Sequence, residues 1–144
     1  MKKERFRVMV AAHLLLKNEN KVLLSLRQNT GHRDGEYGLV AGHVEEGESI
    51  QDCMIREAKE EADIVLSTED IHFFHIFDRT WKEYVNFCFV AEKWEGEIKN
   101  MEPGKCADLS WFNMDQLPEN TIPYVKDLVQ AYKKGQYFSD THRD

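Results

Sequence analysis

Residues 42–64 read GHVEEGESIQDCMIREAKEEADI, and this segment carries the strongest structural signal in the chain. Ser49 is a favourable helix N-cap residue, and the acidic residue Asp52 three positions later reinforces a helix start at that point. Apolar residues then recur at helical spacing as far as Ala62. We therefore predict a helix from Ser49 to Ala62 with one apolar stripe that packs on a core.

Three glutamates lie beside that stripe. At about 100° per residue, Glu57, Glu60 and Glu61 fall within an arc of roughly 100° on the predicted helix. Carboxylates this close repel one another, and a bound cation relieves the repulsion. Because the cluster contains no cysteine or histidine, it favours Mg²⁺ or Mn²⁺ over zinc. The alternative is a solvated acidic face, since glutamate-rich helices are common.

The remaining segments predict an α/β (α+β) fold with a mixed sheet and helices on its faces. Residues 28–36 and 95–104 are polar and predict loops. The tail from Gln136 to Asp144 is polar, and we expect it to fray. The predicted strands are Arg5–Leu16, Lys21–Arg27, Tyr37–Ala41, Ile71–Asp78, Tyr84–Trp94 and Asp108–Phe112, and a second helix is predicted over Ile122–Lys134.

Length and composition restrict the class of protein. The 144 residues fit one domain over 1–144, and 42% hydrophobic with 31% charged residues allows a core beneath a solvated surface. No apolar run approaches the roughly 20 residues of a membrane span, and the charged N-terminus lacks a signal-peptide core. Cys53, Cys88 and Cys106 are far apart and predict reduced thiols. We expect a cytoplasmic protein without a membrane partner.

The net charge of −7 limits the partners. An acidic domain repels nucleic-acid backbones, so DNA binding is not expected. A phosphate-containing ligand would have to be met by a local basic patch or by metal ions.

The pattern Gly42-x5-Glu48-x7-Arg56-Glu57-Ala58-x-Glu60-Glu61-x-Asp63-Ile64 resembles the Nudix box, Gly-x5-Glu-x7-Arg-Glu-U-x-Glu-Glu-x-Gly-U, where U is bulky or apolar. Residues 37–42 and the segment Trp111-Phe112-x-x-Asp115-x-Leu117-Pro118 also resemble family segments. The resemblance implies a small, MutT-like member with the Nudix α/β/α sandwich. Asp63 replaces the second glycine of the box, and aspartate adopts the left-handed conformation at modest cost.

The resemblance also implies roles for residues of the box. Glu57, Glu60 and Glu61, with the backbone carbonyl of Gly42, would ligate Mg²⁺, for which Mn²⁺ is a substitute. Arg56 would hold the carboxylates by charge-assisted hydrogen bonds, with Glu48 as its partner.

The general base differs across the family. It is either a glutamate of the box, with Glu57 and Glu60 as candidates, or a carboxylate from a later loop. Glu102 is the loop candidate, because Pro103 and Gly104 would shape a turn beside it. The alternative for Glu102 is a solvated loop glutamate.

Residues that bind the substrate are harder to assign from sequence. The candidates are Arg27, Tyr37, Arg79, Asn86 and Lys105. The basic residues would contact phosphates, the tyrosine would stack on a base, and Asn86 would contact a base edge. Each has an ordinary structural alternative, because strand aromatics are more often core and strand polar residues more often face solvent.

The implied reaction is attack of water on a nucleoside diphosphate linked to a group X. The sequence lacks the signatures of three subfamilies. No proline occurs between Ile64 and Pro103, where ADP-ribose hydrolases of the family typically have one. The tyrosine typical of dinucleoside polyphosphate hydrolases and the proline-rich array of NADH-cleaving members are also absent. By elimination we expect a (d)NTP or modified nucleotide cleaved to a nucleoside monophosphate and pyrophosphate. The alternatives are an RNA 5′-pyrophosphohydrolase and a non-catalytic nucleotide-binding sensor. Many relatives are homodimers, which makes a homodimer a further possibility.

Overall fold

The computed structural model describes residues 3–140 and contains one mixed sheet and two helices. The strands run β3-β2-β1-β6-β5-β8, with β4 paired to β1 and β7 paired to β2. The elements in chain order are β1 Met9–Asn18, β2 Lys21–Arg27, β3 Tyr37–Gly38, β4 Val40–His43, α1 Ile50–Ala62, β5 His72–Arg79, the 3₁₀ turn η1 Thr80–Lys82, β6 Tyr84–Ala91, β7 Cys106–Asn113, α2 Pro123–Lys134 and β8 Phe138–Asp140.

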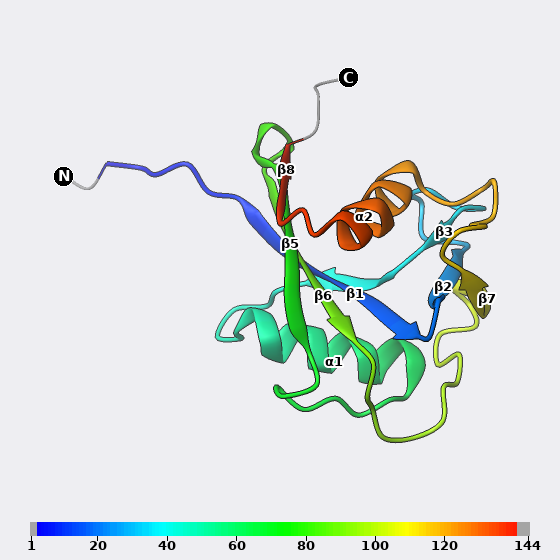
Figure 1. The fold of residues 1–144 in the computed structure, drawn as a ribbon. Coiled ribbons are helices and arrows are strands. Elements are labelled where there is room, and N and C mark those ends of the chain that lie inside the picture. Colours follow the sequence, from blue (N-terminus) through cyan, green and yellow to red (C-terminus); the bar gives the residue numbers. More distant parts are fainter. Residues whose placement is uncertain (1–2, 141–144) are drawn as a thin grey trace.

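The helices cover opposite faces of the sheet, with α1 on one side and α2 on the other (Figure 1). The long strand β1 is central, because it pairs parallel with β6 and antiparallel with both β2 and β4. Its alternating side chains serve both layers: Leu14 and Leu16 pack in the core under α1, and Leu15 packs in the core under α2. This confirms the predicted mixed sheet with a helix on each face.

Several predicted boundaries shift by a few residues. The first strand begins at Met9 instead of Arg5, and the predicted strand Tyr37–Ala41 is two short strands that pair with different neighbours. The predicted strand from Tyr84 ends at Ala91, before Trp94. Strand ends depend on the partner strand, which a local pattern does not contain.

The prediction of a frayed tail is wrong over residues 138–140. These residues form β8, which pairs parallel with β5 so that Phe138 lies opposite Ile76. The buried ring of His75 holds this strand, with Nδ1 2.7 Å from the Gln136 carbonyl oxygen and Nε2 2.7 Å from Ser139 Oγ. A polar segment is ordered here because β5 offers it backbone and side-chain partners. Residues 141–144 lie outside the described residues.

Within residues 3–140, neither helix combines the length and the apolar character needed to cross a membrane.

Candidate active site

Helix α1 is fixed at both ends by the residues that the sequence indicated. Ser49 Oγ accepts a hydrogen bond from the Asp52 amide at 3.0 Å. At the C-terminal end, Asp63 adopts the left-handed conformation with φ 59°, and its amide donates to the Lys59 carbonyl. The buried stripe of Cys53, Met54, Ala58 and Ala62 faces the sheet. This orientation leaves the glutamate face beside β4.

Arg56 is the centre of the charged cluster. Its Nε and Nη2 donate to the two carboxylate oxygens of Glu48 at 2.7 and 3.0 Å, a bidentate pair. Its Nη1 donates to Glu57 Oε1 at 2.8 Å and to Glu60 Oε2 at 3.1 Å. Its Nη2 also donates to the His43 carbonyl oxygen of β4, at 3.1 Å. Arg56 therefore ties the loop before α1, the helix and β4 together.

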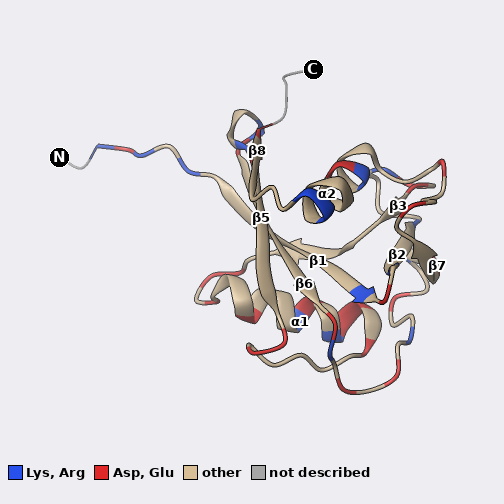
Figure 2. Ribbon diagram, in the orientation of Figure 1, with Lys and Arg blue, Asp and Glu red and all other residues tan. Residues whose placement is uncertain are grey.

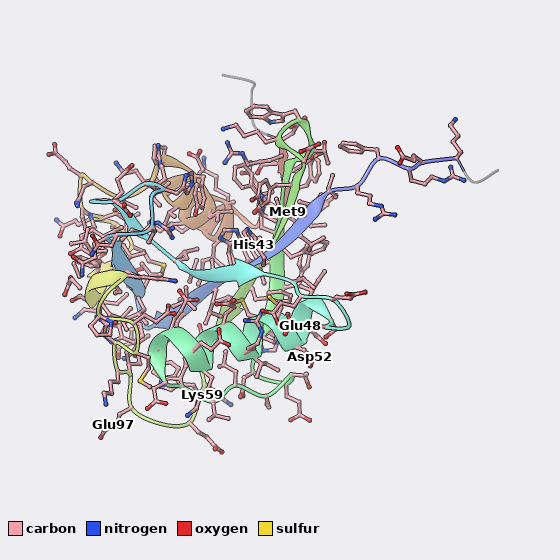
Figure 3. The ribbon with its side chains drawn as sticks, turned by 180° about the vertical axis from the view of Figure 1, so that it is seen from behind. Met9, His43, Glu48, Asp52, Lys59 and Glu97 are labelled. Carbon is pink, nitrogen blue, oxygen red and sulfur yellow. The ribbon has the colours of Figure 1, made fainter. Side chains whose placement is uncertain are left out.

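Glu48 is the partner of Arg56 that the resemblance implied. Hydrogen bonds from Arg56 and from the Glu45 amide lower the pKa of Glu48 to about 2. Glu48 stays ionised at neutral pH and keeps the guanidinium in place. Figure 3 shows Glu48 on the loop that enters α1, below β4 and His43, while Lys59 lies on the outer side of the helix.

Gly42 and Glu57 are in close contact. A Cβ atom on Gly42 would lie 2.1 Å from Glu57 Cδ, far inside van der Waals contact. A side chain at position 42 would therefore displace the Glu57 side chain, which is 14% exposed. The Gly42 carbonyl oxygen also lies at this point and receives the Cys53 thiol at 3.7 Å. Glu57 thus lies against the backbone of Gly42, whose carbonyl oxygen the resemblance implies as a ligand of the same metal ion.

Glu61 is turned further inward than its neighbours. Its Oε2 atom is buried and has no hydrogen-bond partner within the part of the chain that the structure describes. Burial raises the pKa of Glu61, and the nearby carboxylates of Glu57 and Glu102 raise it further. A cation at this oxygen would remove both penalties.

The loop over residues 95–105 brings Glu102 to the same place. The amides of Lys99 and Met101 donate to the Ala62 and Glu61 carbonyls at 3.0 and 3.2 Å, which satisfies two carbonyl groups at the end of α1. The amides of Lys105 and Cys106 both donate to the Glu102 carbonyl at 2.9 and 2.8 Å, so the turn after Glu102 is defined. The predicted loop carboxylate therefore lies beside the glutamates of α1.

These residues line a pocket of about 510 Å³. The glutamates Glu57, Glu60 and Glu61 line it from α1, and Glu102 lines it from the loop. Arg27, Asn29, Thr30 and Lys105 line the same pocket and add hydrogen-bond donors. Acidic and basic side chains thus meet in one cavity, as binding a metal ion together with an anionic substrate requires.

The donor set fits a hard divalent cation. It consists of carboxylate oxygens and a backbone carbonyl, and one buried oxygen of Glu61 lacks a partner in the described residues. Arg56 holds one oxygen of Glu57 and one of Glu60, and Glu60 is 53% exposed. Among residues 3–140, no three acidic, histidine or cysteine side chains already converge as a ligand group. The carboxylates would have to reorient toward a cation by side-chain rotation.

The predicted substrate-binding residues separate into two groups. Arg27 and Lys105 line the pocket, whereas Tyr37, Arg79 and Asn86 do not. The Tyr37 hydroxyl donates to Asp108 Oδ2 at 2.7 Å, and burial together with this hydrogen bond raises the tyrosine pKa to about 12.

Asn86 is buried, and Arg79 lies at the end of β5. The side chain of Asn86 contacts His13 Nε2 through Oδ1 at 3.0 Å and donates to the Phe77 carbonyl at 3.2 Å. Arg79 lies over aromatic rings at the end of β5.

Sequence reasoning missed the polar residues Asn29 and Thr30 of the pocket. Asn29 has φ 54° and donates to the Gly104 carbonyl at 3.0 Å, which joins the two loops that frame the pocket. The only signal was their position in a polar loop, which many solvated residues share. A clearer signal for contact with an anionic ligand lies in the segment Asp78-Arg79-Thr80-Trp81-Lys82, because basic and aromatic residues alternate there.

Comparisons with known proteins point to the same family as the sequence resemblance, the Nudix family. A family model of the NUDIX domain matches residues 6–132. A curated relative named NAD-capped RNA hydrolase NudC, from Vibrio vulnificus (strain CMCP6), is 36% identical over 93 residues, which are 65% of this chain and 34% of that protein. The protein of the same name from Pectobacterium carotovorum subsp. carotovorum (strain PC1) is 29% identical over 123 residues, 84% of this chain and 45% of that protein. The chain thus spans less than half the length of these relatives.

Solved structures share the fold. A MutT Nudix hydrolase from Burkholderia pseudomallei has a TM-score of 0.77 at 23% identity and covers 87% of this chain and 98% of its own. A Nudix hydrolase from Nitrosomonas europaea has a TM-score of 0.77 at 19% identity, with 96% and 82% covered. With the family match over residues 6–132 and the box residues assembled around one pocket, the chain belongs to the Nudix hydrolase family.

Proposed function

We propose that the protein hydrolyses a phosphoanhydride bond in a nucleoside diphosphate linked to a second group, with a divalent metal ion. The observation that carries the proposal is the placement of Glu57 against Gly42 and of the unpartnered Glu61 oxygen in one pocket with Arg27 and Lys105. Carboxylates in such surroundings suit a cation, and the basic residues suit phosphates.

Glu57, Glu60, Glu61 and the Gly42 carbonyl would hold Mg²⁺, or Mn²⁺ in its place. When bound, the metal supplies charge neutralisation for the diphosphate and lowers the pKa of the attacking water. Arg56 keeps the carboxylates in position through its contacts to Glu48, Glu57 and Glu60.

The other residues of the pocket act on the substrate. Arg27 and Lys105 would bind phosphate oxygens, because both line the pocket and neither forms an ion pair with a carboxylate of residues 3–140. Glu102 is our candidate for the group that takes the proton from water, since it shares the pocket with the glutamates of α1. The alternative base is a glutamate of the box.

Two substrate classes are candidates. A (d)NTP or modified nucleotide follows from the absence of the signatures of other subfamilies in the sequence. The 5′ end of RNA, including an NAD-capped end, is favoured by the name of the curated relatives, NAD-capped RNA hydrolase. Both require the same attack of water at a diphosphate.

A hydrolysis screen of the purified protein tests the proposal. The panel holds (d)NTPs, oxidised (d)NTPs, ADP-ribose, NADH, dinucleoside polyphosphates, triphosphorylated RNA and NAD-capped RNA, each with Mg²⁺, Mn²⁺ or EDTA. We expect metal-dependent hydrolysis of at least one compound, loss of it in Glu57→Gln, and retention in the control Glu69→Gln, an exposed residue. Nucleotide binding without hydrolysis under any condition would instead identify a sensor.

The role of Glu102 has its own test. Glu102→Gln should lower kcat by roughly 10²-fold or more and remove the acidic limb of the pH–rate profile, because an amide takes no proton. Glu97→Gln, on the same loop and exposed, is the matched control. An unchanged profile would assign the base to Glu57 or Glu60.

A further inference from the structure

Aromatic rings and cationic side chains lie against one another from α2 to the tip of the β5–β6 hairpin. The rings of Tyr124 and Phe77 stack with centroids 5.8 Å apart. Arg79 Cζ lies 5.7 Å from the Phe77 centroid and 5.6 Å from the Trp81 ring. Lys82 Nζ lies 5.3 Å from the same Trp81 ring. We call Phe77, Arg79, Trp81, Lys82 and Tyr124 the basic ladder.

The cations of the ladder have no carboxylate ion-pair partners within residues 3–140. Within residues 3–140, neither Arg79 nor Lys82 forms an ion pair, and the buried Nε of Arg79 has no hydrogen-bond partner. The adjacent acid, Asp78, accepts from the Thr80 amide at 2.8 Å. Cations held by rings keep their charge available to an external anion.

Cationic side chains from β2, from the loop after it and from the β5–β6 hairpin lie near His32. Burial lowers the pKa of His32, and the positive charges of Arg27, Arg33, Lys82 and Arg79 lower it further. Four cations from two separate segments therefore lie within electrostatic range of one imidazole. Arg33 pairs with Glu36 at 3.2 Å, whereas Arg27, Arg79 and Lys82 form no ion pair within residues 3–140.

Arg27 connects this basic surface to the pocket. Its Nε donates to the His32 carbonyl at 2.8 Å, and it also lines the cavity that contains the glutamates. A substrate whose diphosphate occupies that cavity can therefore continue past Arg27 toward the hairpin.

The N-terminal arm leaves the fold at the other end of the ladder. The Met9 amide donates to the Glu83 carbonyl at the hairpin turn, at 2.7 Å. The exposed arm before it carries Arg5, Arg7 and the 70% exposed Phe6. Figure 2 shows basic residues with an acidic one among them along the arm, and acidic residues with basic ones among them along α1.

We propose that the basic ladder binds the single-stranded RNA chain that adjoins a 5′-terminal nucleotide held in the pocket. Arg79 and Lys82 would contact phosphodiesters of the chain. This inference rests on the proposed function and names RNA 5′ ends as its substrate class.

Direct binding tests the surface without catalysis. The ligand is a fluorescent single-stranded RNA of about 12 nucleotides with a 5′-monophosphate, measured by anisotropy at several salt concentrations. The double variant Arg79→Gln/Lys82→Gln should weaken binding by about tenfold at low salt and reduce the salt slope by about 1.4, because each lost phosphate contact removes about 0.7. Lys82→Gln alone should give about half the change in the salt slope. Because Lys82 is exposed, this single variant keeps the test valid if Arg79→Gln impairs folding.

The control Lys21→Gln/Lys93→Gln changes the net charge equally at two exposed sites away from the ladder. An equal loss of affinity in control and ladder variants would refute a specific surface. Equal competition by polyglutamate would reassign the ladder to an acidic protein segment.

Kinetics separate this inference from the proposed function. The ladder variant should raise KM for a capped oligonucleotide by about tenfold and by much less for the free capping dinucleotide, because only the former has a chain. Equal losses on both would assign the ladder to the nucleotide itself. A wild-type protein that hydrolyses nucleotides without binding RNA would overturn only the RNA inference, whereas RNA binding without any hydrolysis would overturn only the proposed function.

Discussion

The carboxylate cluster around Arg56 lines the pocket, whereas the basic ladder lies outside it, and the charged groups of the two regions have different neighbours. Arg56 lies among several carboxylates, with Glu48, Glu57 and Glu60 at 2.7–3.1 Å. Arg79 instead lies over two aromatic rings and has no carboxylate partner among the described residues. Each region therefore keeps an excess of one sign. The first suits an added cation, and the second suits an added polyanion.

The largest change should come from a box glutamate. Glu57→Gln keeps the shape of the side chain but removes the charge pressed against Gly42. We expect kcat to fall on the order of 10³-fold, with the fold intact in a thermal melt, because the lost interaction serves the transition state. Near-normal Mg²⁺-dependent turnover would show that Glu57 is not a metal ligand.

Arg56→Lys should have the next largest effect. A lysine cannot reproduce the fork that joins Glu48, Glu57 and the His43 carbonyl. We expect kcat/KM to fall by about 10–100-fold, as for other groups that orient metal ligands. Glu45→Gln is the comparison, because this 69% exposed carboxylate lies 3.8 Å from Arg56 and should matter little. Equal effects of the two substitutions would contradict a central role for Arg56.

Glu61 predicts a pH dependence of stability in EDTA. Its folded-state pKa is raised above the ordinary value of 4.5, so the unfolded chain releases this proton first. The contribution of protonated Glu61 to the free energy of unfolding is present below about pH 4.5, and it is lost as the pH rises toward the folded-state pKa. Glu61→Gln should therefore melt higher than the wild type in EDTA, increasingly so as pH rises. Added Mg²⁺ should raise the melting temperature of the wild type more than that of the variant. A variant that melts lower at every pH would argue against the buried, unpartnered oxygen.

The smallest effect is expected outside the pocket, at Asp63. This residue has φ 59°, which favours glycine by about 1 kcal/mol. Its exposed ion pair with Lys59 offsets a few tenths of a kcal/mol of that gain. Asp63→Gly should thus raise the melting temperature by about 1–2 °C and leave activity unchanged. A clear loss of stability would show that the Lys59 pair contributes more than exposed pairs usually do.

Much of α1 could be predicted because its signals are local. The Ser49 cap, the apolar stripe and the left-handed Asp63 all involve residues within one or two helical turns. Arg56 and Glu48 are eight positions apart, and the resemblance supplied their pairing. Strand β8 and the burial of Asn86 were not predictable, since both depend on partners far away in sequence, such as His75 and His13.

The distinction between Glu60 and Glu61 shows the same limit. Both belong to the predicted carboxylate face, yet Glu60 is half exposed while an oxygen of Glu61 is buried without a partner in the described residues. The difference arises because Glu61 lies under β4 and beside the loop that carries Glu102. Local spacing places a residue on a face but does not say what covers that face.

By itself the sequence determined the family, the carboxylate helix and the α/β layers, because these follow from periodicity, capping and a motif within 23 residues. Only the tertiary structure decided which carboxylate is desolvated, that Glu102 joins the pocket, and that Arg27, Arg79 and Lys82 lie near the same imidazole, that of His32. The physical reason is that burial and electrostatic fields depend on through-space neighbours. Those neighbours come from strands and loops that the sheet brings together from distant parts of the chain.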